Sequence, residues 1–161
     1  MVENLMIEIE IPGLKQFHFE HLVLDVNGTI AKDGLLIEGV AELLAKLGSR
    51  LSIHLITADT HGHQEAIDRI LSLKGVLIPK EKQAEAKLKY IEQLGADKVV
   101  AVGNGANDAA MLEAAGLGIC VVGPEGSAVQ ALVRADVVAP DIRAALELLA
   151  FPKRLVATLR R

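Results

Sequence analysis

The 161-residue chain is poor in cysteine and in aromatic residues. Its single cysteine, Cys120, can form neither an internal disulfide nor a zinc site that needs several cysteines. Phenylalanine, tyrosine and tryptophan together make up 2% of the residues, so few rings are present on which the bases of a single-stranded nucleic acid could stack. These absences argue against a disulfide scaffold and against a protein that binds single strands.

An excess of positive charge and long apolar runs are also absent. Lysine and arginine number 17 against 21 acidic residues, which gives a formal net charge of −4 and argues against nucleic acid as the main partner. No stretch approaches the roughly 20 apolar residues that span a bilayer, and the N-terminal alternation of Glu and Ile lacks the apolar run of a secretory signal. We therefore expect a soluble, cytoplasmic protein with no nucleic-acid and no membrane partner.

The apolar content is high enough for a packed core. Apolar residues make up 51% of the chain and charged residues 24%, and a chain of about 150 residues can bury roughly 70% of its unfolded surface. We predict one domain over residues 1–161. It consists of an N-terminal strand pair (1–20), a core (21–150) and a C-terminal helix (151–161).

Hydrophobic periodicity predicts strands that alternate with helices, the pattern of an α/β fold. This alternation implies a doubly wound, Rossmann-like parallel sheet with helices on both faces. An N-terminal pair of β-strands precedes it. The predicted strands cover 6–11, 17–20, 21–26, 51–56, 76–78, 98–102, 117–122 and 137–138, and the predicted helices cover 38–47, 64–73, 84–94, 108–115, 127–134, 142–149 and 152–161.

Polar side chains follow four of the predicted strands. Ligands of open parallel sheets bind beyond the carboxyl ends of the strands, so these residues are expected to meet at one place. They are Asp25 with Asn27, Thr57 with Asp59, the segment from Lys82 to Lys87, and Asn104 with Asp108.

Asp25 stands at the end of a nearly all-apolar strand, where a carboxylate is costly without a cation or donors nearby. It is therefore a nucleophile, a metal ligand or a capped structural aspartate. The Gly28-Thr29 turn that follows can aim backbone amides at an anion. The hydroxyl of Thr57 could hold a phosphoryl oxygen.

Two further elements complete the set. Lys87, in the first turn of a predicted helix, could reach the same anion, while Asn104 and Asp108 offer the oxygen ligands that Mg²⁺ prefers. An acceptor carboxylate, an anion cradle and a metal clamp are what phosphoryl transfer through a carboxyl-phosphate requires.

The motifs DVNGT, LITAD, a helix lysine and VGNGANDAAML resemble, in this order, the four motifs of the haloacid dehalogenase superfamily. The chain is most similar to the small, soluble members that are related to P-type ATPases. The resemblance implies that Asp25 is the nucleophile and that Thr57 and Lys87 bind the phosphoryl group. It also implies substrate contacts from Gly28, Thr29 and Ala58, and a Mg²⁺ site formed by Asp25, Asn27, Asn104 and Asp108.

Two positions depart from the superfamily pattern. Most phosphatases of the group carry an acid–base aspartate two residues after the nucleophile, where this chain has Asn27. General acid–base catalysis typically contributes about 10²–10⁴-fold, so we expect a slow phosphohydrolase with a long-lived phosphoaspartate. Asn104 stands where the superfamily usually has a metal-binding aspartate, which should weaken Mg²⁺ binding.

The spacing of the motifs leaves no room for a cap domain. Between Thr29 and Thr57 lie 27 residues, and 29 lie between Thr57 and Lys87, whereas a separate core needs about 40. Only a hairpin at 32–36 is predicted near the site. Members of the superfamily without a cap act on large substrates or use a lid from another subunit. We therefore expect a phosphorylated small-molecule or protein substrate and a homo-oligomer.

Several alternatives remain open from the sequence. Lys82 could replace Lys87 as the phosphate ligand, and His61 and His63 are interpreted as a polar loop that could contact substrate. The GNGAND segment fits a dinucleotide fingerprint poorly, and a receiver domain would need its acidic residues elsewhere. The main rival hypothesis is an impaired module that only binds phosphate or a partner, because asparagine occupies both expected aspartate positions.

Overall fold

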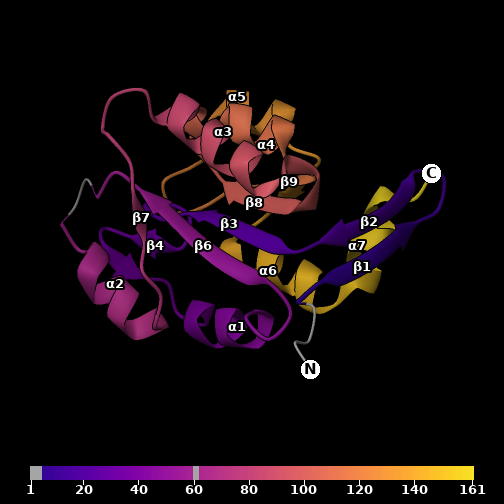
Figure 1. Ribbon diagram of the computed structural model, residues 1–161, viewed down its shortest axis with the longest axis horizontal. Helices are drawn as coiled ribbons and strands as arrows, with labels where there is room; N and C mark the ends of the chain where they lie inside the picture. The colour runs from indigo at the N-terminus through magenta and orange to yellow at the C-terminus, as the bar shows by residue number, and fades with distance from the viewer. Residues whose placement is uncertain (1–4, 60–61) are drawn as a thin grey trace.

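The computed structural model describes residues 5–59 and 62–161, which form a six-stranded parallel sheet with helices on both faces (Figure 1). The sheet confirms the predicted α/β, doubly wound architecture. The strand order is β10-β9-β8-β3-β6-β7. Its members are β3 (His21–Asp25), β6 (Ser52–Thr57), β7 (Val76–Leu77), β8 (Val99–Gly103), β9 (Leu117–Val121) and β10 (Val137–Ala139).

Helices cover both faces of the sheet (Figure 1), and an apolar layer holds them to each face. Helices α1 (Val40–Leu47) and α6 (Ile142–Ala150) bury residues spaced three or four apart; α6 buries Ile142, Ala145, Leu146 and Leu149. On one face lie α1 (Val40–Leu47), α2 (Gln64–Leu71) and α6 (Ile142–Ala150), and on the other lie α3 (Gln83–Leu94), α4 (Ala109–Ala114) and α5 (Val129–Arg134). A short 3-10 turn, η1 (Ala96–Lys98), leads into β8.

The predicted N-terminal strand pair forms a separate antiparallel hairpin. It consists of β1 (Ile7–Ile11) and β2 (Lys15–Phe19), with Ile7 opposite Phe19. Alternate residues of β1 are buried, and the predicted C-terminal helix, α7 (Pro152–Leu159), packs against this strand. The hairpin and α7 lie together at one end of the molecule, away from the carboxyl ends of the strands (Figure 1).

A second, smaller hairpin lies where the sequence predicts it. Strands β4 (Ala31–Lys32) and β5 (Leu35–Leu36) pair antiparallel across a turn in which Asp33 and Gly34 both have positive φ. This is the backbone that an Asp-Gly dipeptide favours in a two-residue hairpin loop.

Helix starts differ from the prediction at several places. Helix α1 begins at Val40 instead of at residue 38, and α5 begins at Val129 instead of at residue 127. The helix expected over 108–115 is a 3-10 turn, η2 (Ala106–Asp108), followed by α4. Ala128 stays extended because its backbone N–H donates to the carbonyl of Asn104 at 2.8 Å. The late start of α5 therefore comes from a contact between loops that the sequence pattern does not show.

The strand order creates the place for the site. Strand β3 pairs with β6 on one side and with β8 on the other, so the chain leaves β3 in both directions along the sheet. Asp25 and Thr57 are the last residues of β3 and β6, and Asn104 directly follows β8. Open α/β sheets bind ligands at the carboxyl ends of two neighbouring strands from which the chain connections run in opposite directions along the sheet.

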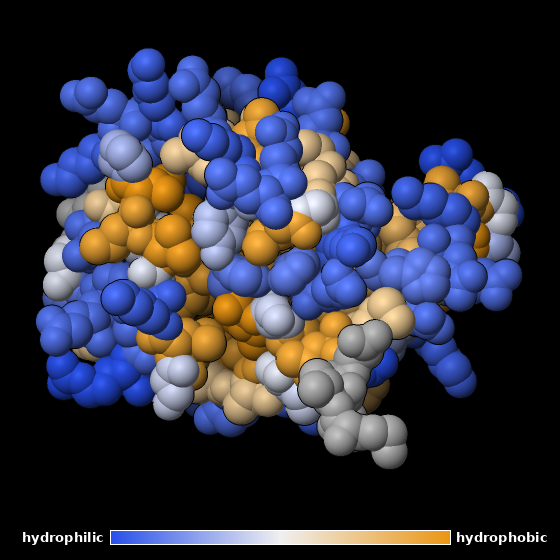
Figure 2. Space-filling model, viewed as in Figure 1, coloured by the Kyte–Doolittle hydropathy of each residue, from blue (hydrophilic) through white to orange (hydrophobic). Residues whose placement is uncertain are grey.

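Apolar side chains reach the surface near the β7 edge of the sheet. Figure 2 shows apolar residues gathered on the face over β6 and β7, between more polar helices, and exposed members of this region include Ile70 and Leu77. Within the described ranges, 5–59 and 62–161, no helix is long and apolar enough to cross a membrane.

Leu24, in the central strand β3, has an exposed fraction of 0%, whereas Leu77 on the edge strand β7 is 65% exposed. We expect Leu24→Ala to lower the free energy of unfolding by about 2–5 kcal/mol, since it removes packed methyl groups and leaves a cavity. The same change at Leu77 should alter it by less than about 0.5 kcal/mol. Urea unfolding of both variants checks this, and equal losses would contradict the assignment of β3 to the core.

Candidate active site

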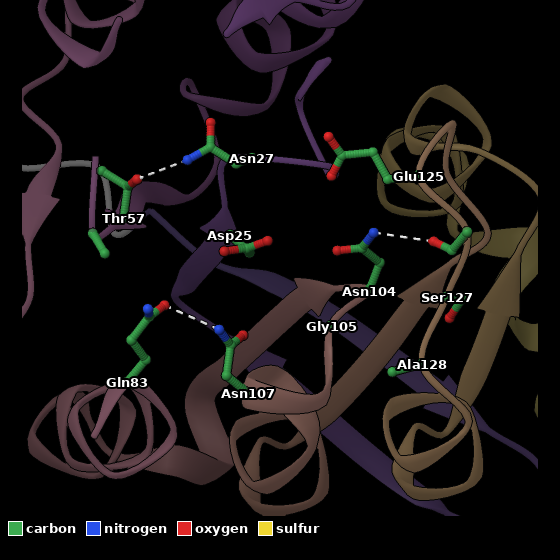
Figure 3. A pocket seen from close by; sticks show the side chains of 12 residues that line it. Asp25, Asn27, Thr57, Gln83, Asn104, Gly105, Asn107, Glu125, Ser127 and Ala128 are labelled. Atoms are coloured by element: carbon green, nitrogen blue, oxygen red, sulfur yellow. Dashed lines mark hydrogen bonds between the residues drawn. The ribbon is translucent and has the colours of Figure 1, made fainter. Parts of the chain in front are cut away.

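A cavity of about 600 Å³ opens at the carboxyl edge of the sheet (Figure 3). Its wall combines the loops after β3, β6, β8 and β9 with the start of α3. The lining residues are Asp25, Asn27, Thr57, Ala58, Gln83, Asn104, Gly105, Asn107, Glu125, Gly126, Ser127 and Ala128. The strand ends that the sequence singles out therefore do meet at one place.

A buried lysine bridges two carboxylates at the base of this cavity. Lys87 Nζ lies 2.9 Å from Asp25 Oδ1 and 2.7 Å from Asp108 Oδ1, and the exposed fraction of Lys87 is 1%. Its third hydrogen bond, at 3.0 Å, goes to Asn107 Oδ1. All three ammonium protons are thereby used. A lysine held in this way keeps a positive charge next to Asp25.

The cluster contains more negative than positive charge, and this affects Asp25. Burial and the neighbouring Asp108 raise the pKa of Asp25 from 3.8 to about 7, although Lys87 and Thr29 act in the opposite direction. Burial alone would lower the pKa of Lys87, but the attraction of Asp25 and Asp108 raises it. Lys87 is therefore charged, while Asp25 can exchange a proton near neutral pH.

The structure distinguishes between the two candidate lysines. Lys87 lies in α3 four residues before the buried Ile91, on the face of the helix that meets the sheet. Lys82 precedes α3 as its cap residue, is exposed, and does not line the cavity. Lys87 is thus the lysine beside Asp25.

Asp108 departs from its predicted role as a direct metal ligand. Its Oδ1 accepts from Lys87, while its Oδ2 accepts the backbone N–H groups of Asn104 at 3.1 Å and Gly105 at 3.0 Å. It is fully buried and does not line the cavity. Asp108 instead fixes the turn after β8 and positions Lys87.

Asn104 and Asp25 present oxygens to a common point. The hydroxyl of Thr29 lies 3.0 Å from Asp25 Oδ2 and 3.3 Å from Asn104 Oδ1. Asn104 is oriented by its amide nitrogen, which donates to the carbonyl of Gly126 at 3.1 Å (Figure 3). Carboxylate and amide oxygens suit a hard divalent cation.

The oxygens of Asp25 and Asn104 fit a weak magnesium site better than a strong one that several carboxylates form. Among the described residues, no group of three or more His, Cys, Asp or Glu side chains is arranged to hold a metal ion. A cation bound here would rely on one carboxylate, Asp25, and on neutral oxygens such as that of Asn104. The weakened affinity expected from asparagine at position 104 stays a prediction.

The predicted amide cradle at Gly28-Thr29 is not available to an anion. The N–H of Gly28 donates to the carbonyl of Ala31 at 2.8 Å, and that of Thr29 donates to Val26 at 3.1 Å. Both groups close the turn after β3. The contribution of Thr29 is its hydroxyl, and that of Gly28 is a backbone with φ +80° that places no side chain in the site.

Thr57 and Asn27 lie next to each other, on the side of the cavity opposite Asn104 (Figure 3). Asn27 Nδ2 lies 3.4 Å from Thr57 Oγ1, which also accepts the N–H of Asp59 at 2.9 Å. Because Thr57 accepts both contacts, its own hydroxyl proton can be donated to a ligand. Ala58 lines the cavity beside it.

Of the two loop histidines, the described residues include His63, which does not line the cavity. His61 lies outside the described residues. His63 packs against the hairpin at Gly34, where its ring would collide with a Cβ, and it does not line the cavity. The interpretation of His63 as a substrate contact therefore receives no support.

Sequence reasoning missed part of the site. Gln83 precedes Lys87 by one helical turn, and Asn107 Nδ2 donates to Gln83 Oε1 at 3.0 Å (Figure 3). The four-residue spacing to Lys87 would have identified Gln83. In the sequence, Gly123-Pro124-Glu125-Gly126 is interpreted as a strand-to-helix turn that could border the site. No pattern in the sequence singles out Glu125 or Ser127.

Residues 2–116 match the family described as haloacid dehalogenase-like hydrolase. The chain belongs to this family. Among curated proteins, the uncharacterized protein MJ0073 of Methanocaldococcus jannaschii is 46% identical over 79 residues, which are 47% of this chain and 85% of that protein.

Solved structures agree with the fold. The 3-deoxy-D-manno-octulosonate 8-phosphate phosphatase of Moraxella catarrhalis, in complex with magnesium, phosphate and KDO, superimposes with a TM-score of 0.64 at 19% identity. The match covers 88% of this chain and 94% of that one. A zinc-transporting PIB-type ATPase in its E2.Pi state gives 0.58 at 23% identity over 76% of this chain and 20% of that one. The predicted membership in the haloacid dehalogenase-like hydrolases is thereby confirmed.

The charge cluster predicts how stability depends on pH. The pKa of Asp25 is higher in the folded state, so this group favours folding at low pH and loses that contribution as the pH rises from about 4 to 7. Asp25→Asn removes the titration and leaves Lys87 paired with Asp108. In metal-free buffer we expect the variant to gain stability over the parent across this window, by roughly 4 kcal/mol at most.

Urea unfolding of both proteins between pH 4 and 8 measures this difference. Asp33→Asn, in the exposed turn of the small hairpin, is the matched control and should follow the parent at every pH. A variant Asp25→Asn that is less stable than the parent at pH 7 would contradict the proposed electrostatics.

Proposed function

We propose that the chain is a Mg²⁺-dependent phosphohydrolase that forms a phosphoaspartate on Asp25. One observation carries this proposal: the Asp25 carboxylate lies in the cavity wall, bound to a buried lysine, with Thr57 and Asn104 lining the same cavity. A capped structural aspartate would not need such a lysine or an open cavity in front of it. This arrangement favours a role for Asp25 in catalysis or in metal binding over that of a capped structural aspartate, and the two favoured roles can coexist.

The substrate is proposed to be a phosphate monoester. A carboxylate oxygen of Asp25 attacks phosphorus, the bond from phosphorus to the ester oxygen breaks, and the leaving oxygen takes up a proton. Lys87 keeps positive charge beside the transferred group, and the Thr57 hydroxyl donates to one of its oxygens. When bound by Asp25 and Asn104, with Asn27 beside them, Mg²⁺ would neutralise charge on the phosphoryl oxygens.

The second half of the reaction is hydrolysis of the acyl-phosphate. Water attacks phosphorus, the bond to the Asp25 oxygen breaks, and the carboxylate is restored. The Asn27 amide can orient a water molecule or the leaving group, but it cannot accept or donate the proton that moves in each half. We therefore expect a slower turnover, with more accumulated phosphoaspartate, than with an aspartate at position 27.

Other parts of the assignment stay predictions. These are a phosphorylated small molecule or protein as substrate, one domain without a cap, a cytoplasmic location and a homo-oligomer. In the structure, only the β4–β5 hairpin and α1 lie between β3 and β6, which supports a site without its own lid. A screen of phosphorylated metabolites with Mg²⁺ would identify the substrate class.

Asp25→Asn should abolish phosphate release, because an amide oxygen is a poor nucleophile. Phosphate release from p-nitrophenyl phosphate with Mg²⁺ measures the effect, with Asp33→Asn as the control of unchanged rate. Full activity of Asp25→Asn would refute the phosphoaspartate mechanism.

The same pair of proteins tests the binding-module hypothesis, which the asparagines at 27 and 104 favour. Beryllofluoride with Mg²⁺ mimics an acyl-phosphate only on a reactive carboxylate. It should raise the melting temperature of the parent but not of Asp25→Asn. Stabilisation of both proteins by the same amount would favour a module that only binds anions.

Asn27→Asp should raise turnover by about 10-fold or more, since a carboxylate at this position can transfer the protons that the amide cannot. The measurement is kcat with Mg²⁺ together with the lifetime of the phosphoenzyme, which should shorten. A lower or unchanged kcat with a normally folded variant would show that position 27 does not limit the reaction.

A further inference from the structure

The cavity contains a second carboxylate that the mechanism above does not use. Of the twelve residues that line it, only Asp25 and Glu125 carry titratable side chains. Lys87 and Asp108 lie behind Asp25 and are fully engaged with one another and with their neighbours. Among the residues that line the cavity, Glu125 is therefore the carboxyl group other than Asp25 that could transfer a proton to or from a substrate.

The loop that carries Glu125 is fixed to the rest of the site. Within it, the N–H of Gly126 donates to the carbonyl of Gly123 at 3.0 Å. The carbonyl of Gly126 accepts from Asn104 Nδ2 at 3.1 Å, and a Cβ at Gly123 would lie 2.6 Å from the carbonyl oxygen of Gly28. The loop after β9 thus packs directly on the turn after β3, between the two halves of the site.

Glu125 points from this loop across the cavity mouth. Its Oε2 lies so close to Gly28 that a Cβ at position 28 would collide with it, and Gly28 directly follows Asn27. Figure 3 shows the carboxylate facing the space between Asn27 and Asn104, with Asp25 beneath. Within residues 5–59 and 62–161 it has no hydrogen bond or ion pair, so both oxygens are available to a water molecule or a substrate.

We propose that Glu125 is the acid–base residue of this enzyme. It takes the role of the aspartate that most phosphatases of the group carry at the position of Asn27. In the first half-reaction, protonated Glu125 gives its proton to the leaving ester oxygen as the bond from phosphorus to that oxygen breaks. In the second half, the Glu125 carboxylate takes a proton from the attacking water as the bond from phosphorus to the Asp25 oxygen breaks. Glu125 is thereby protonated again and Asp25 is a free carboxylate, so the cycle closes.

This inference rests on the proposed phosphohydrolase function and is tested with the intact chain. Glu125→Gln keeps the shape of the side chain but cannot transfer a proton. We expect kcat for p-nitrophenyl phosphate and the rate of phosphoenzyme hydrolysis to fall by about 10²-fold, with little change in KM. Glu92→Gln, an exposed glutamate of α3 away from the cavity, changes the net charge equally and should leave both rates unchanged.

A double-mutant cycle separates proton transfer from other roles. In the Asn27→Asp background, residue 27 can move the proton itself, so Glu125→Gln should cost less than about 5-fold. Equal losses in both backgrounds would overturn the proposal, because they would indicate that Glu125 only binds substrate. Recovery of Glu125→Gln at raised Mg²⁺ concentration would also overturn it and would make Glu125 a metal ligand.

Chemical rescue supplies a second readout. Glu125→Ala opens the cavity mouth, and added formate should restore several-fold activity to this variant by acting as a diffusible carboxylate. Formate should not rescue Asp25→Asn. Full activity of Glu125→Gln, with Asp25→Asn inactive, would remove Glu125 from the mechanism and leave the phosphoaspartate intact. Full activity of Asp25→Asn would instead refute the proposed function itself.

Discussion

The ion cluster of Asp25, Lys87 and Asp108 is the interaction on which the rest of the structure depends. It joins three separate elements, the end of β3, the first turns of α3 and the turn before α4, through contacts of 2.7–2.9 Å. Two carboxylates share one ammonium group, so the cluster has a net negative charge when Asp25 is ionised. Removing one partner from a buried pair of this kind typically costs about 3–5 kcal/mol when a charge is left alone. The geometry of the catalytic edge is therefore maintained by electrostatics as well as by the apolar layers.

A neutral asparagine at position 104 adds no charge to the cluster of Asp25, Lys87 and Asp108, which already contains two carboxylates and one ammonium group. A third carboxylate here would lie next to Thr29 and Asp25 and would add a negative charge with no further cation among the cavity-lining residues to offset it. The amide supplies a neutral oxygen toward Asp25, and its nitrogen fastens the loop after β9. The same side chain thus belongs to the proposed metal-ligand set and also fixes the opposite wall of the cavity. We expect a neutral ligand at this position to bind a divalent cation more weakly than a carboxylate would.

Most of the fold and half of the site follow from local sequence patterns. Buried strands of a parallel sheet appear as apolar runs, so Asp25, Thr57 and Asn104 could be assigned to strand ends and therefore to one edge. The extended Ala128 and the turn η2 depend on hydrogen bonds to Asn104 and Asp108, and no periodicity reports these. Glu125 lies 97 positions after Gly28 in the sequence. Only the packing of the two loops shows that they share a cavity.

Most of the polar side chains that line the cavity are uncharged. Asn27, Gln83, Asn104 and Asn107 line it with amides, which offer donors and acceptors but no net charge. In the proposed function, selection of a phosphoryl group would then come from the lysine behind Asp25, from the Thr57 hydroxyl and from a bound cation. Glu125 lies at the mouth, where the proposed mechanism places the leaving group, so its carboxyl can donate a hydrogen bond to the ester oxygen of the proposed substrate. A phosphate monoester would meet both requirements of the proposed function.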